Sequence, residues 1–255
     1  MKSGRIRWGL ALCIILGFVI GAMLWFNGLL AAKVYPAFQA FRGYRILQSV
    51  PHYEREQVGN FTVRYDSVDF DRFHDLEEII DEYGGRVLDL FDYAPVKAID
   101  VILFSDEGEF HQSLGIPMDQ PTIGAYSGGK IAVLERSLDG LEENMLINSF
   151  VHELTHLVVD NLAGGNFPVW FTEGSALYIE HMLLGYEWGQ ELGVTDTYSI
   201  EELTDDFYGL DEYRAYRQAF IEVRAMIERI GWDGYLDLLR VLKDGSDPLS
   251  QFMKF

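Results

Sequence analysis

One stretch of the chain, Ser149–His156, has residue types at a spacing that could do chemistry. His152 and His156 lie four positions apart, so on an α-helix both imidazoles project from the same face. Neutral imidazoles placed in this way can occupy two corners of a tetrahedral zinc site. Glu153 lies about 100° round the helix from His152, so it can reach a metal-bound water without being a ligand. His-Glu-x-x-His is the pattern of zinc metallopeptidases, in which the glutamate is the general base.

A third metal ligand is expected from the next helix along the chain. At about 1.5 Å per residue, His156 lies about 10 Å before the expected helix end at Ala163. By the same rise, Glu173 lies about 7.5 Å into the helix expected to begin at Pro168. Because the connection is short, the two helices should return antiparallel, which brings Glu173 to the depth of the histidines. Gly174 would allow the helices to approach closely beside the metal.

Two ordinary histidines on a half-buried helix are the competing interpretation. With six histidines in 255 residues, the motif should arise by chance in roughly one sequence in a hundred. The predicted helix is otherwise apolar, and burying these groups costs several kcal/mol unless they are paired or bind a metal. We therefore favour the metal site. Four further histidines have no matching partners and are interpreted as surface or core residues: His52, His74, His111 and His181.

The motifs H-E-x-x-H at 152–156 and W-x-x-E-G at 170–174 together resemble the gluzincin metallopeptidases. More closely, they resemble the bacterial peptidase MA-like domains, and the resemblance covers about residues 60–255. It implies a zincin-like metallopeptidase fold, with Glu153 as general base and proton shuttle. It also implies that one Zn²⁺ per chain is held by His152, His156 and Glu173.

The resemblance further implies a strand that binds substrate. In such enzymes a strand shortly before the metal helix pairs with the backbone of an extended peptide, which is a common mode of peptide recognition. In this chain the strand is Ile123–Tyr126, and its expected substrate-binding residues are Gly124, Ala125 and Tyr126. A plain sheet edge without a role in binding is the alternative.

A tyrosine that stabilises the oxyanion is also implied. Arg214–Ala219 resembles the segment that carries it in these domains, which makes Tyr216 the expected catalytic phenol. Tyr213 is the nearest competitor, and a tyrosine that only packs is the alternative.

The chain departs from the family pattern at one position. Many gluzincins have an acid four residues after the third ligand, where it orients a zinc-bound histidine. Leu177 stands at that position here. Glu180 lies on the same helix face and could replace the acid, Asp160 is a second candidate, and a backbone carbonyl is the third possibility.

The remaining pattern predicts an α+β fold with a small mixed sheet and a helical carboxyl-terminal half. Asp139 and Glu142 form a capping-box pattern before the metal-site helix. The expected strands are Asn60–Asp66, Ala98–Phe104 and a hairpin of Thr122–Ser127 and Lys130–Glu135. The expected helices are Val34–Val50, Phe70–Tyr93, Asp106–Leu114, Gly140–Ala163, Pro168–Leu184, Leu210–Ile230, Trp232–Leu242 and Pro248–Met253.

The amino terminus predicts one transmembrane anchor. Residues 1–7 form a basic tail, and 8–32 carry no charge and are long enough to cross a bilayer. The run is too long for a cleaved signal peptide, and Cys13 is poorly placed for a lipoprotein signal. The positive-inside rule puts the tail in the cytoplasm and the rest outside the cell membrane. Residues 33–58 are expected to form a juxtamembrane helix and linker, and 59–255 the peptidase domain.

Composition restricts the partners. Of the net charge of −20, residues 1–33 contribute +4, which leaves −24 on residues 34–255 and excludes nucleic acid as a partner. Cys13 is the only cysteine, so no intrachain disulfide can form. Gly17 and Gly21 match a small-xxx-small pattern and predict a weak homodimer.

The predicted function is that of an extracytoplasmic, membrane-anchored zinc metallopeptidase that cleaves a peptide or protein substrate. Two alternatives stay open. One is a catalytically silent zinc-binding or scaffolding domain of the same fold, and the other is an anchored domain that binds no metal.

Overall fold

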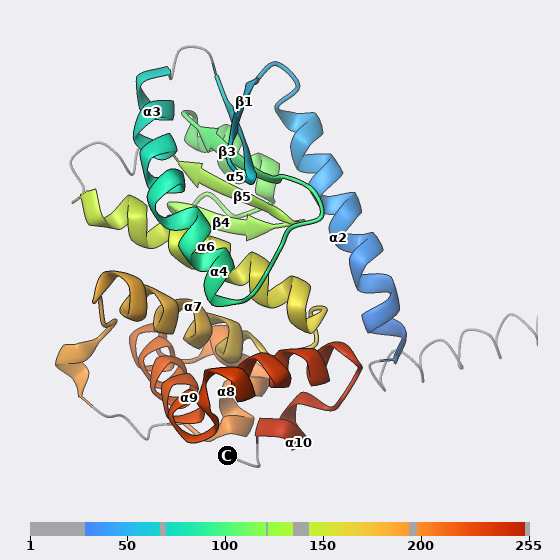
Figure 1. The fold of residues 1–255 in the computed structure, drawn as a ribbon, viewed down its shortest axis with the longest axis vertical. Coiled ribbons are helices and arrows are strands. Elements are labelled where there is room, and N and C mark those ends of the chain that lie inside the picture. The colour runs from blue at the N-terminus through green and yellow to red at the C-terminus, as the bar shows by residue number, and fades with distance from the viewer. Residues whose placement is uncertain (1–28, 67–69, 121, 135–142, 194–197, 253–255) are drawn as a thin grey trace, which may run out of the picture.

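Within the residues that the structure describes, five strands form one mixed sheet, and helices cover both of its faces (Figure 1). The computed structural model describes residues 29–66, 70–120, 122–134, 143–193 and 198–252. The strand order is β1-β2-β3-β5-β4, with antiparallel pairs at both ends and parallel pairs in the middle. The predicted α+β class is therefore confirmed for the described residues. The strands are β1 (Glu54–Val58), β2 (Phe61–Tyr65), β3 (Ile99–Phe104), β4 (Gly124–Ser127) and β5 (Lys130–Leu134).

Strand β3 runs through the middle of the sheet and is buried along its whole length, as predicted. Its side chains alternate between two cores, because successive residues of a strand point to opposite faces. Val101 and Leu103 belong to the larger core, which extends into the helical half. Ile102 and Phe104 belong to a smaller core under helices α2 (Leu29–Ser49) and α5 (Glu107–Leu114).

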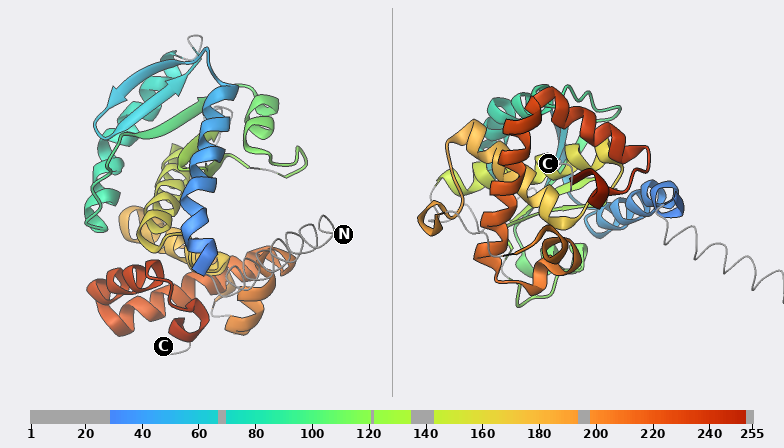
Figure 2. Two further views of the ribbon diagram at one scale, coloured as in Figure 1. Left: turned by 90° about the vertical axis from the view of Figure 1, so that its right-hand side faces the viewer. Right: turned by 90° about the horizontal axis from the view of Figure 1, so that it is seen from below.

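Helix α2 lies along one side of the molecule and packs on the sheet through its small and aliphatic residues (Figure 2). Ile46 is buried, and a side-chain carbon at Gly43 would lie 2.1 Å from the backbone oxygen of Gly128, so helix and hairpin touch through their backbones. Two aromatic residues of α2, Phe38 and Phe41, are more than half exposed, so they do not lie on the face that packs on the sheet.

The segment 33–58 contributes more to the fold than a linker would. Besides α2, it supplies β1, which pairs with β2 across the two-residue turn at Gly59 and Asn60. The sheet therefore begins before the domain boundary at residue 59 that the sequence suggested.

Three long helices build the half of the molecule that carries the candidate site: α6 (Glu143–Ala163), α7 (Val169–Leu184) and α9 (Glu212–Lys243). A side-chain carbon at Gly174 would lie 2.2 Å from the backbone oxygen of Ala219, so Gly174 allows α7 to approach α9, and not α6 as the sequence suggested. Helix α6 ends at Ala163, and both following glycines have positive φ. Gly231 interrupts α9 at the predicted break between two helices.

The remaining helices differ from prediction at their ends. The helix expected over Phe70–Tyr93 is α3 (Phe70–Ile79), a π-helical turn η2 (Ile80–Gly84) and α4 (Gly85–Leu90). The stretch after α7 also contains a short helix that was not predicted. The other elements are η4 (Gln190–Leu192), α8 (Ile200–Asp206), η5 (Phe207–Gly209) and α10 (Pro248–Phe252).

Several predicted features lie outside the described residues. These are the basic tail 1–7, the anchor 8–32 apart from its last residues, Gly17 and Gly21, and the cap at Asp139 and Glu142. In the part of the chain that the structure describes, no helix combines the length and the apolar character needed to cross a membrane.

Candidate metal centre

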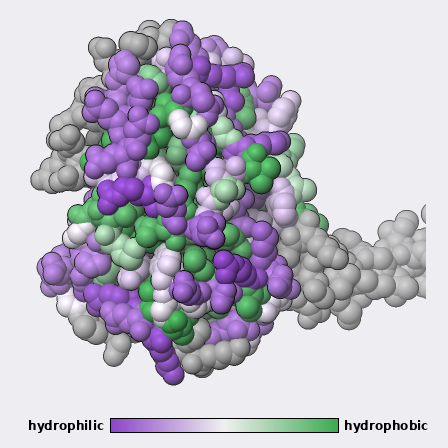
Figure 3. Space-filling model, in the orientation of Figure 1, coloured by the Kyte–Doolittle hydropathy of each residue, from purple (hydrophilic) through white to green (hydrophobic). Residues whose placement is uncertain are grey.

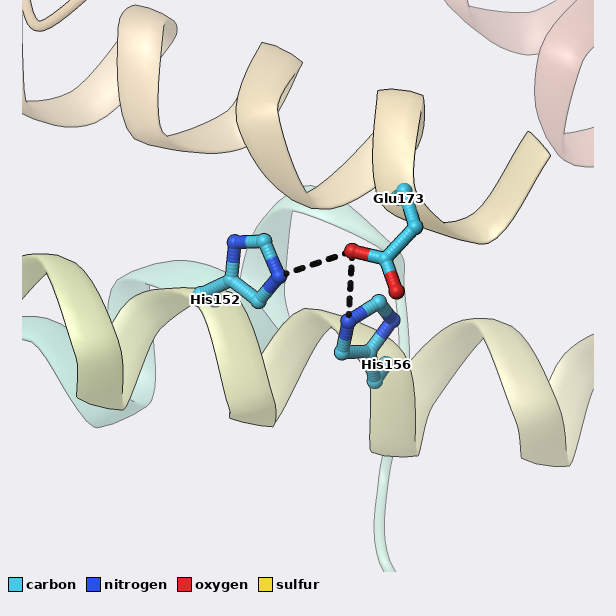
Figure 4. A group of neighbouring side chains, drawn as sticks. All are labelled: His152, His156 and Glu173. Atoms are coloured by element: carbon cyan, nitrogen blue, oxygen red, sulfur yellow. Dashed lines mark hydrogen bonds and ion pairs between the residues drawn. The ribbon is translucent and has the colours of Figure 1, made fainter. Parts of the chain in front are cut away.

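The two histidines of α6 and the first glutamate of α7 converge on one point (Figure 4). The Nε2 atom of His152 lies 3.2 Å from Oε2 of Glu173, and Nε2 of His156 lies 3.5 Å from the same oxygen. One ligand atom from each residue lies within 4.8 Å of the others. Among the described residues, these three form the only group of histidine, cysteine and acidic side chains that could hold a metal ion.

The donor set fits zinc. Ligand bonds of about 2.0–2.1 Å in a tetrahedron place neighbouring ligand atoms about 3.3–3.4 Å apart. The two nitrogen-to-oxygen separations of 3.2 and 3.5 Å bracket that value. Two imidazoles and a carboxylate are also the three-ligand set of catalytic zinc sites, which leave a fourth position for water or substrate. Three ligands of this kind therefore leave one position of a tetrahedral zinc site open.

Both imidazoles are oriented through their second nitrogen. Nδ1 of His152 lies 2.5 Å from Oε1 of Glu180, and Nδ1 of His156 lies 2.7 Å from Oγ1 of Thr172. Such contacts hold each ring so that Nε2 faces the metal position. The acid missing at Leu177 is thus supplied one helical turn later, by Glu180. Thr172 was not anticipated, although its position next to Glu173 is the signal that could have identified it.

Asp160, the other candidate for orienting a histidine, has a different role. Its carboxylate accepts hydrogen bonds from Tyr35 of α2, at 2.5 Å, and from Tyr126 of β4. Asp160 therefore ties α2 and β4 to the carboxyl-terminal end of α6. Burial raises the pKa of Asp160 despite the two phenol donors, which lower it.

The centre is electrostatically coupled. Burial opposes the charge on Glu173, but His156 and His152 outweigh it, so the pKa of Glu173 lies below its ordinary value. Burial likewise lowers the pKa of His152, and the carboxylates of Glu173 and Glu180 more than reverse this, so its pKa is raised. Glu153 differs from Glu173, because burial dominates and raises its pKa. The site therefore raises the pKa of Glu153 and lowers that of Glu173.

Strand β4 lies directly beside Glu153. It is the last strand of the sheet, so its outer side has no strand partner among the described residues. The backbone N–H of Tyr126 donates a hydrogen bond to the Glu153 carboxylate. A side-chain carbon at Gly124 would lie 2.1 Å from Oγ of Ser149 and 3.3 Å from Cγ of Glu153, so a larger residue here would crowd both side chains. Gly124, Ala125 and Tyr126 all line the cleft at the centre.

The cleft has a volume of about 790 Å³ and is lined by residues from several elements. Helices α6 and α7 form its floor with the metal-site residues, β4 forms one side, and α2 contributes Tyr35, Gln39 and Arg42. Figure 3 shows apolar surface along the waist between the sheet and the helical half, with hydrophilic surface above it. The other four histidines, His52, His74, His111 and His181, do not line this cleft.

Tyrosines of the helical half also line the cleft. Tyr216 lines the cleft, and burial followed by the charge of Glu173 raises its pKa. Tyr213 does not line the cleft, and its ring packs on Trp188 with centroids 5.0 Å apart. Of the two predicted candidates, Tyr216 is therefore the one that faces the centre.

Tyr208 is a cleft residue that the sequence did not indicate. Its phenol contacts Glu173, and although Tyr208 is 72% exposed, partial desolvation of the phenol and the charges of Glu173 and Glu153 raise its pKa. It follows α8 in the short turn η5, where no motif marks it. Its ring packs on Phe207, which in turn contacts Tyr216, so the two cleft tyrosines share one support.

The segment expected to carry the catalytic tyrosine also anchors the cleft wall. Arg217, next to Tyr216, is buried and pairs with Glu187 at 2.7 Å. It also donates to the backbone oxygens of Trp188 and Gly193, at 2.9 and 3.1 Å. The loop after α7 is thereby held against α9.

Comparison with known proteins gives no relative for this chain. No family model, no curated protein and no solved structure matches it. The function must therefore be inferred from the site itself.

Proposed function

We propose that the protein is an extracytoplasmic zinc metallopeptidase of the gluzincin type, with a zincin-like fold and an amino-terminal membrane anchor. One observation carries the proposal. Nε2 of His152, Nε2 of His156 and a carboxylate oxygen of Glu173 meet in a cleft, and Glu153 lies beside them. The proposed resemblance to peptidase MA-like domains agrees with the metal-site geometry.

Each residue has a distinct proposed role. When bound, zinc would supply the Lewis acid that lets water attack a peptide carbonyl at neutral pH. His152, His156 and Glu173 hold the ion, with the imidazoles oriented by Glu180 and Thr172.

Glu153 is the proposed general base. Its carboxylate is buried at the cleft floor and has a raised pKa, which brings it nearer the range in which a base both accepts and returns a proton. It takes the proton from the attacking water and gives it to the leaving amine. Its hydrogen bond from the Tyr126 backbone fixes its distance from the strand that would hold the substrate.

Strand β4 and Tyr216 act on the substrate. The free edge of β4 can pair with an extended peptide backbone, which places the scissile bond along the cleft floor. A phenol is protonated at neutral pH because its ordinary pKa is about 10, and that of Tyr216 is raised further, so it can donate to the developing oxyanion.

The test compares the wild type with Glu153→Gln in the native cell envelope. We expect peptide amino termini that the wild type releases to be absent with Glu153→Gln, while zinc content stays near one per chain in both. Glu191→Gln, an exposed glutamate outside the cleft, is the matched control and should behave as wild type.

Two results would contradict the proposal. Identical released termini from wild type and Glu153→Gln, with zinc bound, would favour a catalytically silent zinc-binding domain. Less than about 0.2 zinc per chain after mild purification would favour a domain without metal.

A further inference from the structure

Arg42 is the one lysine or arginine among the described residues that line the cleft. The rest of the lining is strongly acidic, and the whole chain carries a net charge of −20. An arginine in such surroundings would be expected to pair with one of the acids. Its guanidinium makes no ion pair with any described residue. The acidic lining residues are Glu153, Asp160, Glu173, Glu180 and Glu212.

Three of these acids already have partners within the protein. Asp160 accepts from Tyr35 and Tyr126, Glu180 holds His152, and Glu173 faces both histidines. Arg42 is itself exposed and has no ion-pair partner among the described residues, so its guanidinium can bind a ligand that enters the cleft.

Arg42 lies at the end of the strand that would bind substrate. A side-chain carbon at Gly128, directly after β4, would lie 2.8 Å from the backbone carbon of Arg42. Strands rise about 3.3 Å per residue, so Gly128 is about 7 Å along the strand from Tyr126, whose N–H contacts Glu153. A peptide paired along β4 would therefore bring the residue about two positions from its scissile bond next to Arg42.

Two polar atoms beside this position also lack partners among the described residues. Oε1 of Gln39 and Oγ of Ser127 are buried without a hydrogen bond, and both residues line the cleft. Ser127 is only 7% exposed. The amide nitrogen of Gln39 does have a partner, because it donates a hydrogen bond to the Tyr35 hydroxyl at 2.5 Å. A bound peptide could satisfy both atoms, because its backbone offers N–H donors and C=O acceptors.

We propose that α2 and the end of β4 form a carboxylate-binding subsite, and that the substrates are peptides with a carboxylate about two residues from the scissile bond. The inference rests on the proposed peptidase function and names its substrate class. A planar guanidinium binds a carboxylate through two parallel hydrogen bonds, which explains why this position is arginine. The carboxylate can come from an aspartate or glutamate side chain or from the peptide's carboxyl terminus.

The experiment uses the full chain in detergent micelles, loaded with zinc. Fluorogenic peptides of one neutral sequence are made with Glu or Gln at each position within three residues of the scissile bond. Each is also made with a free or an amidated carboxyl terminus. Arg42→Gln is compared with wild type and with Arg45→Gln, an exposed arginine on the same helix that does not line the cleft. Binding of the same peptides is measured separately by anisotropy in the Glu153→Gln background.

We expect wild type and Arg45→Gln to favour the carboxylate peptide over its neutral match by about tenfold in kcat/KM and in Kd. Arg42→Gln should lose this preference, and Arg42→Glu should favour a peptide with lysine at the same position. If wild type prefers the peptides with Glu at one internal position, the bound carboxylate is a side chain. If it prefers the peptides with a free carboxyl terminus, the bound carboxylate is the terminal one. Equal zinc content in all variants shows that the fold is intact.

The two proposals fail in different ways. Cleavage without a carboxylate preference, or with a preference that Arg42→Gln retains, would overturn the subsite and leave the peptidase standing. Carboxylate binding that depends on Arg42, without cleavage of any peptide, would overturn the peptidase and leave the subsite standing. Neither binding nor cleavage of any peptide would overturn both.

Discussion

Replacing Glu180 removes the carboxylate that orients His152, and it tests whether the pair belongs to a metal site. Oε1 of Glu180 lies 2.5 Å from Nδ1 of His152, and Glu180 is only 4% exposed. Water cannot easily take the place of so buried a partner. Glu180→Gln keeps an acceptor oxygen but loses the charge, whereas Glu180→Leu removes both.

The expected loss is measured on zinc affinity. Removing a partner that orients a metal-bound histidine typically costs about 10- to 100-fold in metal affinity, or about 1.4–2.7 kcal/mol. We expect about tenfold for Glu180→Gln, because the hydrogen bond can still form. We expect about 100-fold for Glu180→Leu, because Nδ1–H is then buried without a partner.

The assay is competition for zinc against chelators of graded affinity, with Glu191→Gln as the control for a lost surface charge. Circular dichroism confirms that each variant is folded. Zinc affinity of Glu180→Leu within twofold of wild type would refute the reasoning, since the contact with His152 would then have no influence on metal binding.

Two further predictions concern catalysis and stability. Tyr216→Phe should lower kcat about 100-fold with unchanged zinc content, as expected for loss of one oxyanion donor. The kcat of Tyr213→Phe should stay within twofold of wild type. If a peptide cleavage assay shows the larger loss for Tyr213→Phe, then Tyr213 and not Tyr216 is the oxyanion donor. Asp100 accepts hydrogen bonds from Arg64 and Lys130, each at 2.7 Å. Burial raises the pKa of Asp100, but the two cations outweigh it, so the pKa is lowered. A carboxyl group whose pKa is lowered on folding stabilises the folded state at pH values above its ordinary pKa of about 3.9. This stabilisation is lost as the pH falls through the lower pKa of the folded state. Asp100→Asn should therefore cost about 2 kcal/mol at pH 7 and less near pH 3, measured by denaturant unfolding; an equal loss at both pH values would contradict this origin.

The metal-site residues could be predicted because local rules place them. The four-residue spacing of His152 and His156 sets their common helix face, and a short connection brings Glu173 back to them. The sequence did not decide which group replaces the acid missing at Leu177, since Glu180, Asp160 and a backbone carbonyl were all candidates. Choosing Glu180 over Asp160 required the packing of α7 against α6, which no local pattern describes.

Elements with polar sequences were missed. In β1, the residues Glu54–Gln57 are all exposed and only Val58 is buried, so the strand has no apolar alternation to reveal it. Helix α8 is also polar, but its capping box between Ser199 and Glu202 could have been recognised from the sequence. Tyr208 could not, because its place beside Glu173 depends on how η5 folds back over the cleft.

If the protein is membrane-anchored as we propose, helix α2 also determines how its domain could be shed. Tyr35 lies three residues after the predicted anchor and reaches Asp160, so a proteolytic cut before Tyr35 would release the domain with every wall of the cleft in place. A cut between α2 and β1 would leave the metal ligands on the released part and Arg42 on the membrane. The released part would then still hold the zinc ligands, but without the wall that we propose selects its substrates.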